Sequence, residues 1–162
     1  MPPIPQEIAE FLACKRIAVA GVSRTGGSAG NGILRKLRAQ GYDAIPVNPH
    51  AVQLGGTACY RDLASIPGDV DGVVIAVAPE AGAELVRAAA ARGIRRVWLH
   101  RSIGQGSVSG DAVAECRRLD LTCIVGGCPL MYCEPVDIVH RCMRAVLAWR
   151  GRLVEVSSPV RT

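Results

Sequence analysis

Short apolar runs alternate with segments of helical periodicity along most of the chain. Apolar runs of strand length, roughly 4–8 residues, predict buried strands at residues 16–21, 43–48, 72–78, 96–100 and 122–125, with a short additional strand at 57–60. Apolar positions that recur every three or four residues predict helices at 31–40, at 80–92, after Ser109 and at 135–150. This alternation is typical of βαβ units and a parallel sheet.

The pattern therefore predicts one α/β domain, a single doubly wound, Rossmann-like parallel sheet with helices on both faces. A length of 162 residues suits one such domain. We expect the domain to span residues 1–154, with its core at 14–130 and the strand at 122–125 closing the sheet. Residues 155–162 are expected to form a frayed tail.

Charge and cysteine usage narrow the class of partner. The formal net charge is +5, but the arginines are dispersed and aromatic residues make up 4% of the chain, so we expect no nucleic-acid partner. No apolar run approaches the roughly 20 residues of a membrane span, and we expect neither a secretory signal nor membrane association. Seven cysteines, mostly inside apolar patterns, favour reduced thiols and a cytoplasmic protein. The apolar C-terminal helix makes a homodimer possible.

Ligands of doubly wound sheets bind at the carboxyl ends of the strands, so the loops that follow the strands carry the candidate site. The loop after the first strand contains G-x-S-x-x-G, a relative of the dinucleotide-binding fingerprint. Small residues allow backbone N–H groups to approach a phosphate, and the start of the next helix favours an anion. The candidate residues in this loop are Gly21, Val22, Ser23, Arg24, Gly26 and Ser28. A glycine-rich turn without a ligand is the alternative.

The loops after the second and central strands bear on which nucleotide could bind. A dinucleotide site usually has Asp or Glu at the end of the second strand, where it binds the ribose. Here that strand ends at Asn48 and Pro49, and the nearby acid, Asp43, lies at its start. This disfavours NAD, although Asn48 could contact a nucleoside or serve only in a local turn. Ala78 and Pro79, after the central strand, could face an adenine or simply begin a helix.

The chain resembles the CoA-binding domain family, which includes small stand-alone proteins and is similar to the CoA-binding domain of succinyl-CoA synthetases. The resemblance rests on AVAGVS at 18–23, GYDAIPVNP at 41–49, CY at 59–60, VWL at 97–99 and GCP at 127–129, and it covers roughly residues 14–130. It implies that the nucleotide part of CoA lies across residues 21–24, 48–49 and 78–79. Many members have an aromatic–Arg pair after the central strand, where this chain has AVAP at 76–79.

Three further residues follow the last two strands of the predicted sheet. His100 is expected to line the ligand or to serve the structure rather than to catalyse, and Arg101 could bind a phosphate. Cys128 could be a small turn residue or could form a mixed disulfide with the CoA thiol. The spacing of Cys128, Cys133, His140 and Cys142 does not fit a structural zinc site, and Cys142 is expected to face the core.

The sequence as a whole favours non-enzymatic binding of coenzyme A or an acyl-CoA, because it offers no complete catalytic constellation. A nicotinamide-dependent (NAD(P)) oxidoreductase and a ligand-sensing regulatory protein remain alternatives. The missing carboxylate after the second strand counts against the first alternative.

Overall fold

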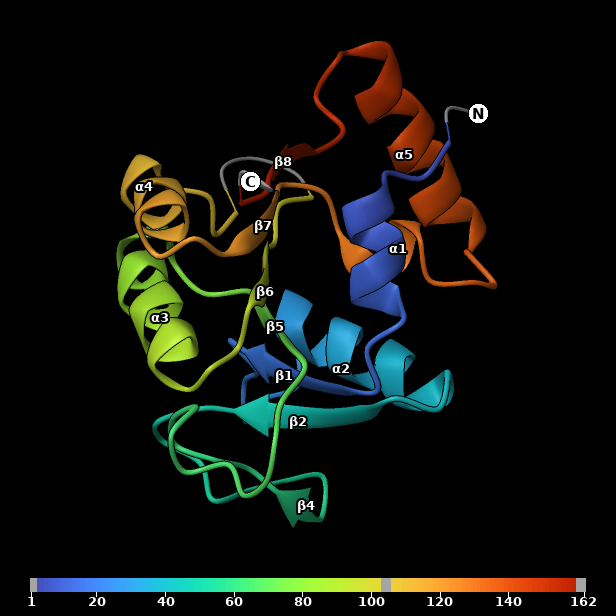
Figure 1. Cartoon of the computed structure of the whole chain (residues 1–162). Coiled ribbons are helices and arrows are strands. Elements are labelled where there is room, and N and C mark those ends of the chain that lie inside the picture. The colour runs from blue at the N-terminus through green and yellow to red at the C-terminus, as the bar shows by residue number, and fades with distance from the viewer. Residues whose placement is uncertain (1–2, 103–105, 160–162) are drawn as a thin grey trace.

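Six strands form the main sheet in the order β2-β1-β5-β6-β7-β8 (Figure 1). The structure is a computed structural model that describes residues 3–102 and 106–159. The first five strands are parallel and the sixth is antiparallel to its neighbour. Their bounds are β1 Arg16–Ala20, β2 Asp43–Val47, β5 Gly72–Ile75, β6 Arg96–Leu99, β7 Thr122–Val125 and β8 Glu155–Ser157. The predicted doubly wound α/β fold is confirmed.

Helices cover both faces of this sheet (Figure 1). On one face lie α1 (Gln6–Leu12) and α2 (Ala29–Ala39), and on the other lie α3 (Pro79–Ala91) and α4 (Gly110–Arg118). The alternation of side chains along β1 explains why both faces are apolar. Ile17 and Val19 pack with the α1 and α2 side chains, whereas Ala18 and Ala20 pack with those of α3 and α4.

The helices begin where the sequence supplies a cap. The Ser28 hydroxyl accepts a hydrogen bond from the Asn31 amide at 3.3 Å, and the Ser109 hydroxyl accepts one from the Ala112 amide at 3.1 Å. Pro79 occupies the first position of α3, where its missing N–H leaves no gap in the hydrogen bonding. These starts fix the loops that connect the strand ends to the helices.

Two expectations about the C-terminal end of the chain and the sheet edge require correction. The tail is not frayed at 155–157, because Glu155–Ser157 forms β8 and pairs with β7, so β7 does not close the sheet. The short strand expected at 57–60 is present as β4 (Thr57–Ala58), which pairs with β3 (Gln53–Leu54) in a small hairpin, and Tyr60 forms an isolated parallel bridge with Val47 of β2. The helix α1 was not predicted from the sequence; its Phe11 packs edge-on against Trp98 with ring centroids 5.4 Å apart.

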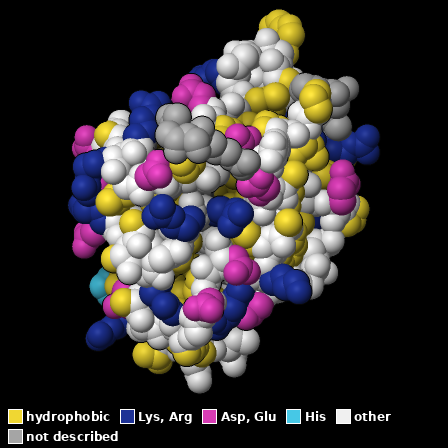
Figure 2. Space-filling view, viewed as in Figure 1, with side chains coloured by type: hydrophobic (Ala, Val, Ile, Leu, Met, Phe, Trp, Pro, Cys, Tyr) yellow, Lys and Arg dark blue, Asp and Glu magenta, His cyan; other side chains and the backbone are white. Residues whose placement is uncertain are grey.

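The C-terminal part consists of the short 3₁₀ helix η1 (Pro129–Met131) and the helix α5 (Ile138–Trp149). The expectation that Cys142 faces the core was wrong, because its side chain is exposed on α5. Ile138 and Trp149 are also exposed, and Figure 2 shows hydrophobic side chains gathered over this part of the surface. The sheet is already covered on this side by α1 and α2, which leaves one side of α5 without a surface to pack on. The homodimer stays a prediction.

Two features of the described residues bear on whether a membrane or a nucleic acid could be a partner. Across residues 3–102 and 106–159, the helices are too short and too polar to cross a membrane. On the face seen in Figure 2, basic and acidic side chains are intermixed and form no stripe of one sign. This agrees with the dispersal of the arginines along the sequence.

Candidate ligand-binding site

The loops at the carboxyl ends of the strands are joined to one another by direct contacts. The Asn48 side chain after β2 donates to the Val22 carbonyl after β1 at 2.7 Å. The Ser107 hydroxyl, which follows β6, donates to the Val77 carbonyl after β5 at 2.6 Å. The Arg101 amide after β6 donates to the Gly127 carbonyl after β7 at 2.8 Å. The structure therefore brings the predicted site residues to one edge of the sheet.

Gly21 joins the loop after β1 to the loop after β5. Its φ is +104°, and a Cβ atom added there would lie 2.1 Å from the Ala76 carbonyl oxygen. Gly30 is also constrained, because its Cβ would lie 2.6 Å from the Gly21 carbonyl oxygen. Glycine at both positions lets α2 begin directly against the strand end, between β1 and β5, where the strand order reverses. This switch point is the usual ligand crevice of the fold.

A buried asparagine that the sequence analysis missed holds the glycine-rich loop in shape. Asn31 accepts a hydrogen bond from the Ser23 amide at 2.8 Å and donates to the Ser23 carbonyl at 3.0 Å. The Ser28 hydroxyl donates to the Gly21 carbonyl at 2.9 Å. Side chains within the protein thus fix the loop backbone without a ligand. An asparagine three positions after the helix cap was the only available signal in the sequence.

The exposed part of this loop runs from Arg24 through Thr25 and Gly26 to Gly27. A Cβ at Gly26 or Gly27 would meet no protein atom within 4 Å. The first N–H groups of α2 have no acceptor within their own helix, and the Ser28 cap satisfies that of Asn31. This end of the loop can therefore accommodate an anionic group at the start of the helix.

Asn48 serves first to position the loops. Its amide nitrogen binds the Val22 carbonyl, and its oxygen accepts from the His50 amide at 2.7 Å. Asp43 lies at the other end of β2, where it pairs with Arg16 at 2.8 Å. Pro49 and Ala78 are exposed beside the site, and Ala78 is the residue before α3. The end of β2 therefore presents an amide where a dinucleotide site would present a carboxylate.

His100 and Arg101 extend the same edge beyond β6. Burial lowers the pKa of His100 to about 4, and the proximity of His140 adds to the shift. His100 is therefore neutral at pH 7 and contributes no positive charge to the site. The Arg101 guanidinium lies over Gly126, where an added Cβ would be 2.9 Å from Nη2. Residues 103–105, which follow this pair, lie outside the described residues.

Cys128 is buried below the loop surface with the core residues of the α1 and α2 face. Burial raises the pKa of its thiol to about 11. The thiolate is the nucleophile in disulfide exchange, so a buried protonated thiol is poorly suited to it. The geometry favours Cys128 as a structural residue, and the mixed disulfide with CoA stays a prediction. Within the described residues there is also no group of three or more His, Cys, Asp or Glu that could hold a metal ion.

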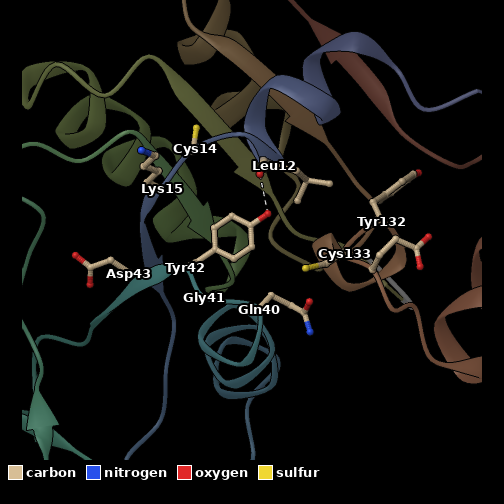
Figure 3. Close-up of a pocket in the computed structure, with 10 residues that line it drawn as sticks. Leu12, Cys14, Lys15, Gln40, Gly41, Tyr42, Asp43, Tyr132 and Cys133 are labelled. Atoms are coloured by element: carbon tan, nitrogen blue, oxygen red, sulfur yellow. Dashed lines mark hydrogen bonds between the residues drawn. The ribbon is translucent and has the colours of Figure 1, made fainter.

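Two hollows lie near β1 and β2, at opposite ends of the sheet. A groove of about 430 Å³ between α2 and the β3–β4 hairpin opens beside Arg24 and Gly26 of the glycine-rich loop. A hollow of about 610 Å³ lies where β1 and β2 begin, and Tyr42, Cys14 and Cys133 line it (Figure 3). The Tyr42 hydroxyl there donates to the Leu12 carbonyl at 2.7 Å. Only the first hollow adjoins the loops predicted to bind a ligand.

Comparison with known proteins places these loops in a recognised family. A family model described as a CoA binding domain matches residues 15–134. Acetate–CoA ligase [ADP-forming] II of Archaeoglobus fulgidus is 36% identical over 91 residues, which are 55% of this chain and 14% of the ligase. The chain thus corresponds to a small part of that curated relative.

Solved structures show the same fold. A hypothetical protein from Pyrococcus horikoshii OT3 superposes with a TM-score of 0.73 and 25% identity, covering 84% of this chain and 98% of that chain. Dinucleotide-forming acetyl-coenzyme A synthetase 1 of Ca. Korarchaeum cryptofilum has a TM-score of 0.61 and 23% identity, covering 72% of this chain and 27% of the synthetase. At 23% identity, the similarity to the synthetase shows a shared fold and nothing further.

Proposed function

Because this chain belongs to the CoA-binding domain family, we propose that it binds coenzyme A or an acyl-CoA through the loops at the carboxyl edge of its sheet. The observation that carries the proposal is the chain of contacts that joins the glycine-rich loop to its neighbours at the switch point between β1 and β5. The pyrophosphate would lie over the loop amides and the start of α2, and Arg24 would add a cation.

The same geometry supports binding without catalysis. Burial makes His100 a weak base, with a pKa of about 4, and holds the Cys128 thiol protonated at pH 7, so neither side chain is well suited to acid–base or nucleophilic catalysis. We propose that the chain captures the ligand and that any reaction of the thioester requires another protein or domain. The similarity to part of an ADP-forming acetate–CoA ligase supports a second form of this proposal, in which the chain supplies the CoA site to a ligase partner.

The runner-up is a nicotinamide-dependent oxidoreductase. Such a site usually places a carboxylate at the end of β2 to bind the ribose. Here Asn48 follows β2, and its side-chain amide already binds the Val22 carbonyl of the loop after β1 and the His50 amide of its own loop. The proposal of a cytoplasmic setting has separate support. All seven cysteines are free, which is typical of proteins in a reducing compartment.

The binding proposal is tested by blocking the loop without disturbing the fold. In Gly27→Val, the new side chain would occupy the open space over the loop, because its Cβ meets no protein atom within 4 Å. CoA at 100 times its dissociation constant adds about 2.7 kcal/mol to the stability, a rise in Tm of roughly 5–10 °C. We expect wild type to show this rise with CoA and not with NADH, and Gly27→Val to lose most of it.

Gly110→Val is the matched control, because Gly110 also faces open space but lies at the start of α4, away from the glycine-rich loop. It should keep the CoA-induced rise. A larger rise with NADH than with CoA would refute the proposal, and an unchanged CoA response in Gly27→Val would place the ligand elsewhere.

A further inference from the structure

The groove beside the glycine-rich loop is lined by three arginines from two elements. Arg24 comes from the loop itself, and Arg35 and Arg38 come from the outer side of α2. Leu54 and Gly55 of the β3–β4 hairpin form the opposite wall. The volume of about 430 Å³ lies within the range of ligand sites, roughly 300–1,000 Å³.

Little in the surrounding protein balances this positive charge. Arg38 is held in place, because its Nε donates to the Ala44 carbonyl at 3.0 Å and its Nη1 to the Thr57 hydroxyl at 3.2 Å. Both acceptors are neutral. Throughout residues 3–102 and 106–159, none of the three arginines forms an ion pair with a carboxylate. The groove is therefore suited to an anion with several acceptor oxygens.

The groove is continuous with the candidate pyrophosphate site but does not coincide with it. Arg24, Thr25 and Gly26 belong to both, whereas Arg35 and Arg38 lie further along α2. An anion in the groove would thus be a second charged group on the ligand whose pyrophosphate lies over the loop. A phosphomonoester offers three acceptor oxygens and nearly two negative charges, and arginine can bind it through paired N–H groups.

We propose that this groove binds a phosphomonoester on the ribose of the nucleotide, so that the chain selects ribose-phosphorylated ligands. This inference rests on the proposed function for its ligand, since CoA carries a 3′-phosphate that dephospho-CoA lacks. The 2′-phosphate of NADPH has the same chemistry. Arg35 is the specificity-determining residue, Arg24 bridges the two anions, and Arg38 holds the hairpin wall.

Isothermal titration calorimetry on the whole chain tests the groove with two pairs of ligands. The first pair is CoA and dephospho-CoA, and the second is adenosine 3′,5′-bisphosphate and AMP, which lack the pantetheine arm. Each pair differs only by the ribose phosphate. We expect the phosphorylated member of each pair to bind about tenfold or more tightly, the effect of one hydrogen bond between charged groups.

Two variants test whether the groove causes the preference for ligands with a ribose phosphate. Arg35→Ala should remove about tenfold from the affinity for CoA and leave dephospho-CoA unchanged. Arg117→Ala, an exposed arginine at the end of α4, is the matched control and should change neither. Both positions are exposed, so neither variant should impair folding.

The outcomes separate this inference from the proposed function. Equal affinity of wild type for CoA and dephospho-CoA would refute phosphate binding in the groove, and so would an equal loss of affinity for both ligands in Arg35→Ala. Either result would leave the proposed CoA binding intact. If CoA does not bind but adenosine 3′,5′-bisphosphate still binds more tightly than AMP, phosphate binding in the groove is supported and the proposed function is refuted. NADPH preferred over NADH, with no binding of CoA, would support the groove with the other cofactor class.

Discussion

The two ends of the parallel sheet are built from different chemistry. At the carboxyl end, the loops contain glycines with close backbone contacts, capped helix starts and Arg24, which forms no ion pair with a carboxylate in the described part of the chain. At the amino end, carboxylates bind the chain: Asp71 accepts from the Arg16 amide at 2.8 Å and the Lys15 amide at 3.0 Å, and Asp43 pairs with the Arg16 side chain. One end presents donors to the outside, whereas the other satisfies its donors internally.

This difference explains why a hollow alone does not identify the ligand site. The amino-end hollow in Figure 3 is the larger of the two beside β1 and β2, but two carboxylates, those of Asp43 and Glu134, line it together with one lysine, Lys15. Burial raises the pKa values of Cys14 and Cys133 there, so their thiols carry little charge at pH 7. An anionic nucleotide is better matched to the carboxyl end.

The largest effect should come from Gly21→Ala. The new Cβ would lie 2.1 Å from the Ala76 carbonyl at a φ of +104°, so the loop and β5 must separate. We expect a loss of more than about 3 kcal/mol in the free energy of unfolding, which corresponds to a fall in Tm of roughly 6–12 °C or more. Urea and thermal denaturation followed by circular dichroism measure both.

Gly41→Ala provides the comparison at the amino end. Gly41 also has a positive φ, +84°, but an added Cβ meets nothing within 4 Å. It should lose only about 1 kcal/mol, the conformational penalty alone. Similar losses in the two variants would mean that the close approach at the carboxyl end contributes nothing of its own.

The second prediction concerns pH and His100. Burial holds the pKa of His100 at about 4, below its ordinary value of 6.5, so the unfolded chain binds the additional proton between these values. The stability is therefore complete above pH 6.5 and falls as the pH drops toward 4. The loss should reach up to about 3 kcal/mol, because one pKa unit corresponds to about 1.4 kcal/mol.

Urea unfolding of wild type and His100→Gln across pH 4–7 measures this loss. The variant should be less dependent on pH in that window. His50→Gln, at an exposed position beside Asn48, serves as the control and should follow wild type. If His100→Gln and wild type lose stability in parallel, the buried imidazole is not the cause.

The sequence predicted the fold and the edge of the sheet at which the loops gather, because strand periodicity and glycine position are local signals. It could not reveal what long-range packing creates. Arg35 and Arg38 look like ordinary solvent-facing positions of α2, and they line a groove only because the β3–β4 hairpin packs opposite them. Cys142 follows the apolar spacing of α5, yet the body of the protein covers only the other side of that helix.

The smallest expected effect lies at the amino end, at Asp71. Hydrogen bonds from the Arg16 and Lys15 amides hold the pKa of Asp71 below its ordinary 3.8. A lowered carboxylate pKa contributes stability above pH 3.8 that is lost as the pH falls through the value in the folded protein. Because Asp71 is largely exposed, solvent screening should keep the cost of Asp71→Asn under about 1 kcal/mol at pH 7.

The stability that depends on Asp71 is lost at a lower pH than the stability that depends on His100. The contributions of the two ends of the sheet can therefore be measured separately. Urea unfolding at pH 7 and pH 3 should show that Asp71→Asn narrows the difference between these conditions, whereas Asp111→Asn, at an exposed position in the first turn of α4, should not. A loss in Asp71→Asn as large as that in Gly21→Ala would contradict the comparison. The amino end would then depend on a single carboxylate as strongly as the carboxyl end depends on its glycine.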